Sequence, residues 1–106
     1  MPKQLNIKAD IKAVWMKLPI YRIWIDDELM CERTFWLNPD EFLIQEDIFV
    51  EVDEGQHQLI LESVDPNLGK VWMDKVSITD TSSNATHDVK PHDPRFDRFQ
   101  KITFQA

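Results

Sequence analysis

The sequence predicts an all-β protein, an antiparallel β-sandwich of the jelly-roll or galactose-binding-like type with about seven to eight strands. Three observations predict it. Residues 5–15 alternate between apolar and polar side chains, residues 21–64 have the pattern of two β-hairpins in series, and no segment carries an apolar stripe of helical period. Short strands separated by turn residues at this spacing are typical of sandwiches.

The first predicted strand covers residues 5–15. One face carries two lysines, Lys8 and Lys12, and the other is apolar through Leu5, Ile7, Ala9, Ile11, Ala13 and Trp15. Because lysines on a strand discourage pairing with other chains, we expect an edge strand here.

The next segment predicts a hairpin with a three-residue loop, Asp26-Asp27-Glu28. This loop makes side chains match across the two strands in apolar, sulfur–aromatic and ion-pair contacts. The expected pairs are Ile25 with Leu29, Ile23 with Cys31, Tyr21 with Arg33, Trp24 with Met30, and Arg22 with Glu32. Cys31 is the single cysteine, so it can form no internal disulfide, and we expect it to be buried as a small apolar residue.

A second hairpin is predicted around a tight turn at Glu54-Gly55, where glycine supplies a positive φ. The inner face then pairs Val52 with His57, Val50 with Leu59, Ile48 with Leu61, and Glu46 with Ser63. The same register places Asp47 opposite Glu62, an unfavourable like-charge pair that suggests a nearby cation or a bulge. We expect His57 to be partly buried, with one ring nitrogen bonded to the backbone.

The remaining chain predicts one more strand at 71–79, a polar loop or arm at 80–98, and a C-terminal strand at 99–106. In the first of these strands Trp72, Val76 and Ile78 share one side, and Trp15 and Trp72 are expected in the core. Residues 1–79 form the predicted sandwich core. The C-terminal strand either completes the same sandwich or pairs with a neighbouring molecule.

Composition and charge restrict the functions that the chain can have. At 106 residues the chain is one domain, and its formal net charge of −7 argues against sequence-independent binding to nucleic acid. No apolar run approaches the roughly 18 residues that span a bilayer, and residues 1–5 lack the apolar core of a signal peptide. We therefore expect no nucleic-acid partner and no membrane partner.

No set of residues has the spacing of a catalytic site, so we expect no enzymatic activity and no cofactor. The acids at the turns either cap those turns or bind calcium, and the first interpretation is favoured because no EF-hand spacing is present. His87-Asp88 and His92-Asp93 contain metal-ligating types, but their spacing fits no rigid face, so no metal is predicted.

Trp24 and Trp36 face away from the apolar stripes beside them. Each is interpreted as core with inverted parity, as part of a subunit interface, or as a platform on which a sugar ring stacks. Aromatic and arginine side chains are enriched in interfaces. The candidate binding residues, for an interface or a glycan, are Arg22, Trp24, Arg33, Trp36, Phe99 and Phe104.

The stretch from Tyr21 to Trp36 resembles the strand pair of small β-sandwich virion proteins of tailed phages, especially those of marine cyanobacteria. The strand Gly55-Gln56-His57-Gln58-Leu59-Ile60-Leu61 is similar to the Gly-x-His-x-Leu-x-Leu strand of jelly rolls that resemble carbohydrate-binding modules. The resemblance implies a non-enzymatic structural protein of the virion, made in the host cytoplasm. It would serve as a capsid decoration or tail-associated protein.

The implied partners are other virion proteins or copies of the same chain, bound through sheet edges and aromatic patches. The alternative is a carbohydrate-binding module that recognises glycans through exposed tryptophans, with or without calcium.

Overall fold

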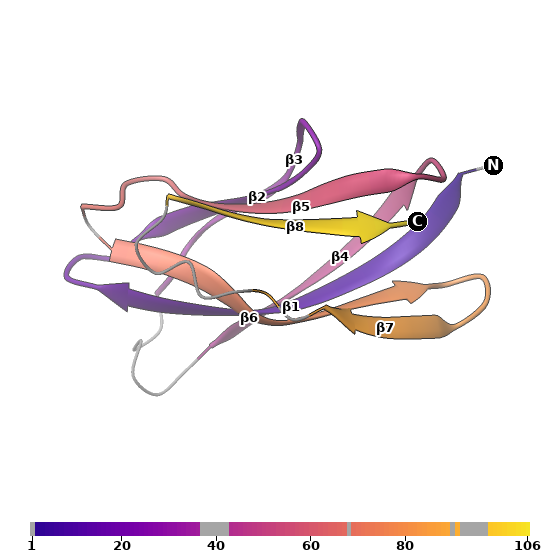
Figure 1. The fold of residues 1–106 in the computed structure, drawn as a ribbon. Coiled ribbons are helices and arrows are strands. Elements are labelled where there is room, and N and C mark those ends of the chain that lie inside the picture. The colour runs from indigo at the N-terminus through magenta and orange to yellow at the C-terminus, as the bar shows by residue number, and fades with distance from the viewer. Residues whose placement is uncertain (1, 37–42, 68, 90, 92–97) are drawn as a thin grey trace.

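The computed structural model describes residues 2–36, 43–67, 69–89, 91 and 98–106, and it contains two antiparallel sheets of four strands each (Figure 1). The predicted all-β sandwich is confirmed. One sheet has the order β4-β1-β6-β7 and the other the order β3-β2-β5-β8. In chain order the strands are β1 (Lys3–Trp15), β2 (Ile20–Ile25), β3 (Glu28–Thr34), β4 (Ile44–Val52), β5 (Gln56–Ser63), β6 (Gly69–Asp80), β7 (Ala85–Val89) and β8 (Phe99–Gln105).

The strict alternation of β1 produces a buried face, as predicted. The alternate residues Leu5, Ile7, Ala9, Ile11 and Ala13 are all buried in the core between the sheets. The predicted edge position is wrong, because β1 lies between β4 and β6 and pairs with both. Lys8 and Lys12 instead face acids on the solvent side of a central strand. Lys8 lies opposite Asp47, and Lys12 forms an ion pair with Asp74 at 3.1 Å.

The first predicted hairpin is formed by β2 and β3. Ile23 pairs with Cys31, Tyr21 with Arg33, and Arg22 with Glu32, as expected. The loop has two residues rather than three, and a bulge in β3 shifts the last pairs to Trp24 with Leu29 and Ile25 with Glu28. Asp26 takes a φ of 53°, and aspartate is one of the few residues besides glycine that adopt this conformation readily.

The second predicted hairpin is wrong in its pairing. β4 pairs with β1, whereas β5 pairs with β2 and β8, so residues 53–55 carry the chain from one sheet to the other. The inward faces are nevertheless as predicted, with Ile48, Val52, Leu59 and Leu61 buried. Alternation determines which face of a strand is buried, but it does not determine the neighbour with which that strand pairs.

The real pairing removes the unfavourable contact between Asp47 and Glu62. Asp47 lies opposite Lys8 in one sheet, and Glu62 lies opposite Arg22 in the other. Each acid of the predicted like-charge pair therefore has a basic residue opposite it on a neighbouring strand, which is a favourable cross-strand pair.

β6 contains a bulge that changes its buried face. The register with β1 shifts next to Asp74, so that Val71, Met73, Val76 and Ile78 all point into the core. Trp72 therefore faces outward and is only partly buried, and Trp15 is also only partly buried. The core prediction is wrong for Trp72, because the bulge reverses the alternation that it assumes. Trp15 lies on the inward stripe of β1, as predicted, and packs against the core without being fully buried.

The predicted arm at 80–98 contains a further strand. A turn at residues 81–84 leads into β7, which pairs with β6. Residues 90 and 92–97 lie outside the described residues. β8 pairs with β5 of the same chain, which is the first of the two arrangements considered for the C-terminal strand. Cys31 is half-buried against the core rather than fully buried.

Two polar side chains from one sheet satisfy backbone groups of the other. β7 pairs only with residues 76–80 of β6, so the edge of β6 before residue 76 has no strand beside it among the described residues. There the amide of Gln100 accepts from the Met73 N–H at 2.6 Å and donates to the Met73 carbonyl at 3.1 Å. The Ser63 hydroxyl accepts from the Val71 N–H at 3.0 Å. These bonds supply what a neighbouring strand would otherwise provide.

Candidate functional site

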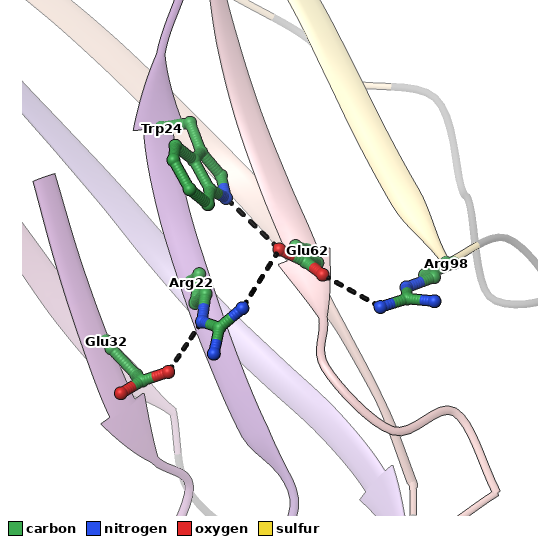
Figure 2. A network of polar contacts seen from close by, with 5 residues as sticks. All are labelled: Arg22, Trp24, Glu32, Glu62 and Arg98. Atoms are coloured by element: carbon green, nitrogen blue, oxygen red, sulfur yellow. Dashed lines mark hydrogen bonds and ion pairs between the residues drawn. The ribbon is translucent and has the colours of Figure 1, made fainter. Parts of the chain in front are cut away.

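The outer face of the β3-β2-β5-β8 sheet carries a charged and aromatic cluster around Glu62 (Figure 2). Glu62 lies on β5, with Arg22 of β2 on one side and Phe99 of β8 on the other. Its side chain is on the outward face, yet Glu62 is only 5% exposed because neighbouring side chains cover it.

Each carboxylate oxygen of Glu62 has its own partners. Trp24 Nε1 donates to Oε1 at 3.2 Å, and Arg98 Nη2 donates to Oε2 at 3.0 Å. The Arg22 guanidinium lies 3.9 Å from Oε1 and donates to Glu32 through Nε. The charges therefore alternate in the order Glu32, Arg22, Glu62, Arg98 across the sheet (Figure 2). A carboxylate buried to this extent requires such donors. The bond from Nε1 to Glu62 in turn fixes the position of the Trp24 indole.

A shallow depression of about 360 Å³ lies beside this cluster. Apolar side chains line part of it, and Arg98 lies over the Phe99 ring with its Cζ atom 5.5 Å from the ring centroid. Charged residues line the rest, and the complete lining is Trp24, Asp26, Asp27, Ile60, Glu62, Phe99 and Lys101. A surface with ring faces beside carboxylates and a lysine suits contact with a polar, partly apolar ligand or a protein side chain.

Only half of the predicted binding residues come together on this face. Arg22, Trp24 and Phe99 do so, as described above. Phe104 is 4% exposed and belongs to the core, because it alternates with the outward residues of β8. It therefore packs inside the sandwich and is not available as a surface contact.

Arg33 lies at the side of the sandwich where β3 approaches β4. It donates to Glu46, which is 5% exposed and also accepts from the Tyr21 hydroxyl at 2.6 Å. Burial, followed by the bond to Glu46, raises the pKa of Tyr21 well above its ordinary value. Burial also raises the pKa of the Cys31 thiol to about 11, so the thiol is protonated and weakly nucleophilic at neutral pH.

Trp36 lies at the end of the sandwich that contains the β1–β2 connection, together with other exposed apolar side chains. Ile20 pairs with Thr34, and the Phe35 N–H donates to the Pro19 carbonyl at 2.8 Å, which places Trp36 beside that connection. We call this the apolar end, and its exposed apolar residues are Val14, Met16, Leu18, Ile20 and Trp36.

The opposite end carries the β2–β3 turn and the β4–β5 connection, and it is strongly acidic. We call it the acidic end, and its exposed acids are Asp26, Asp27, Glu28, Glu51, Asp53 and Glu54. His57 lies among them with its Nε2 atom 2.6 Å from the Asp53 carbonyl, and its ring is tilted against Phe104 at 5.8 Å between centroids. The predicted partly buried histidine with a backbone contact is confirmed.

Among the described residues, no group of three or more His, Cys, Asp or Glu side chains is placed to hold a metal ion. His87 and Asp88 are exposed on β7, and His92 and Asp93 lie outside the described residues. Within the same described ranges, no helix has the length and apolar character that crossing a membrane requires.

Sequence reasoning missed Glu62, Arg98 and Lys101 as members of the outer face. The predicted hairpin pairs Glu62 with Asp47, whereas the structure places it opposite Arg22. Arg98 lies within the segment interpreted as a polar arm. The signal that could have found Glu62 was the unfavourable predicted pair, since a misfit of this kind points to a different strand neighbour.

No protein-family model, no curated protein and no solved structure matches this chain significantly.

Proposed function

We propose that this chain is a non-enzymatic structural module of a phage virion, a capsid decoration or tail-associated protein, that docks through its apolar end. One observation carries the docking role. Among the described residues, Met16 is 89% exposed and Trp36 is 67% exposed at the same end of the sandwich, with Val14, Leu18 and Ile20 exposed beside them. Clustered exposed apolar side chains mark interaction surfaces. The virion assignment is supported by the resemblance of residues 21–36.

The partner that this end fits best is the apolar end of a second copy. Six of the eleven exposed acids among the described residues lie at the opposite end of a molecule whose longest dimension is 44 Å. Two copies that meet through their apolar ends hold these acidic ends apart by much more than about 8 Å, the distance over which physiological salt screens charges. The charge of the acidic end therefore opposes this contact little.

Sedimentation velocity tests the contact with a double variant, Met16→Ser with Trp36→Ser. We expect the natural chain to associate as its concentration rises and the double variant to remain monomeric, because burial of apolar surface drives association. Phe49→Ser is the matched control, since Phe49 is 74% exposed on the outer face of β4 and should leave association unchanged.

A natural chain that stays monomeric up to its solubility limit contradicts docking to a second copy. Equal loss of association in the Phe49 variant would place the contact elsewhere. The virion location is tested independently, by immunodetection of the chain in purified particles, and its presence only in soluble lysate contradicts that location.

Glycan binding is a second candidate function, favoured by the depression between Trp24 and Phe99. Sugar rings stack on aromatic faces while their hydroxyls bond to carboxylates such as Asp26 and Asp27. Titration with oligosaccharides, followed by tryptophan fluorescence, should shift the emission of the natural chain. Trp24→Phe should remove the shift, whereas Trp36→Phe should retain it, and an unchanged spectrum with every oligosaccharide contradicts this candidate.

A further inference from the structure

Both ring nitrogens of His57 face oxygen atoms. Nδ1 lies 2.7 Å from Asp26 Oδ2, and Nε2 lies 2.6 Å from the Asp53 carbonyl oxygen. An ionised carboxylate and a carbonyl can only accept hydrogen bonds, and a neutral imidazole has only one N–H to donate. The two contacts together therefore require a ring that carries a proton on each nitrogen.

The two acceptors belong to segments far apart in the chain. Asp26 is in the turn between β2 and β3 of one sheet, and Asp53 directly follows β4 of the other. Asp26 is itself held on β5, since its Oδ1 accepts from the Gln58 N–H at 2.9 Å and its own N–H donates to the Gln58 carbonyl at 2.9 Å. His57 thus ties the end of β4 to a turn that is already fixed.

We propose that His57 is a proton-operated latch, which holds Asp53, at the start of the β4–β5 connection, against the β2–β3 turn when its ring is doubly protonated and releases Asp53 when the ring becomes neutral. Gly55, at the end of that connection, stays bonded to Ala106 through its own N–H and carbonyl. The latch is independent of docking at the apolar end. A neutral ring keeps at most one of its two bonds. If it keeps the proton on Nδ1, the Nε2 lone pair faces the lone pairs of the Asp53 carbonyl, which is repulsive at 2.6 Å.

The charges around the ring also favour its doubly protonated form. Five acids also line the recess that contains His57: Asp26 and Asp27 of the turn, Glu28 of β3, Glu51 of β4 and Asp53 of the connection. The charged residue on the neighbouring strand is Lys3, which pairs with Val52. Phe104 of β8 supplies only its ring. The imidazolium offsets part of this negative charge, so its loss leaves the carboxylates to repel one another.

The pH dependence of stability follows from the directions of two pKa shifts, those of His57 and Asp26. The bond to Asp26, followed by the bond to the Asp53 carbonyl, raises the pKa of His57 above its ordinary value. The stabilisation is thus fully present below the ordinary histidine pKa of about 6.5 and is lost as the pH rises through the folded-state pKa. The bond from His57 and the backbone bond from Gln58 outweigh desolvation and lower the pKa of Asp26, so the acceptor stays ionised throughout this range.

The NMR titration of the His57 ring protons tests the latch. We expect the His57 midpoint to lie above the ordinary histidine pKa of about 6.5. The carbonyl-carbon shift of Asp53 should change with the His57 midpoint. In Asp26→Asn the His57 midpoint should fall toward the ordinary histidine value. Asparagine tolerates the positive φ of this position, so the turn is preserved.

A second measurement distinguishes a His57 contact that depends on protonation from one that stabilises the fold equally at every pH. The denaturation midpoint of the natural chain should exceed that of His57→Gln at about pH 5.5, and this difference should shrink at about pH 8.5. A His57 midpoint at or below about 6.5, or an Asp53 carbonyl shift that does not follow the His57 midpoint, would overturn the proposal. A difference in denaturation midpoint that is independent of pH would do the same.

Discussion

Replacing Gln100 by leucine should destabilise the fold by about 3 kcal/mol, a large part of the roughly 5–15 kcal/mol that holds a domain of this kind together. Gln100 is 1% exposed, and its amide makes one bond to each backbone group of Met73. Leucine has a similar volume but no polar atom, so the Met73 N–H and carbonyl lose these bonds within the sandwich. A buried group left without a partner costs about 1–3 kcal/mol.

Gln105→Leu is the matched control for this prediction. Gln105 lies on the same strand, β8, but is exposed, so the same chemical change should alter the free energy of unfolding by no more than about 0.5 kcal/mol. Urea denaturation of both variants measures the difference. Equal stability of the Gln100 variant and the natural chain would show that Met73 finds other partners, and the bridging role of Gln100 would then be discarded.

The sandwich could be predicted from the sequence because alternation reports burial directly. β1 shows this well: Leu5, Ile7 and Ile11 are spaced by multiples of two, and all are buried. The same alternation says nothing about which strand lies alongside. Ile48 and Leu61 are therefore predicted on the correct inner surface but opposite each other, although they belong to different sheets.

The candidate site was harder to predict because it depends on that pairing. Alternation within β2 alone predicts that Arg22 and Trp24 lie on the face opposite to Ile23 and Ile25. Glu62 joins Arg22 and Trp24 because β5 lies beside β2. The bulge at Asp74 is a second limit, because the insertion of one residue reverses inside and outside for the rest of the strand.

Arg33→Met tests the second buried carboxylate. Glu46 is held by the Tyr21 hydroxyl and by the Arg33 guanidinium, whose Nη2 lies 3.3 Å from Glu46 Oε2. Without Arg33 a charge that is 5% exposed loses its only basic partner among the described residues. Removing one partner of a fully buried pair costs about 3–5 kcal/mol. The Arg33 side chain is 48% exposed, so water reaches this pair and we expect about 2 kcal/mol.

The companion change Glu46→Gln should restore most of the stability that Arg33→Met removes. The amide oxygen of glutamine still accepts from the Tyr21 hydroxyl, and the uncharged side chain no longer requires a guanidinium. Lys12→Met is the control, because the Lys12–Asp74 pair is about equally exposed on both sides and should contribute no more than about 0.5 kcal/mol. Urea denaturation of the four chains of the cycle measures the coupling. Two outcomes would contradict this dependence of Glu46 on Arg33: Arg33→Met lowers the free energy of unfolding no more than Lys12→Met does, or Glu46→Gln does not restore it. In either case the Tyr21 hydroxyl together with water must satisfy this carboxylate between the sheets.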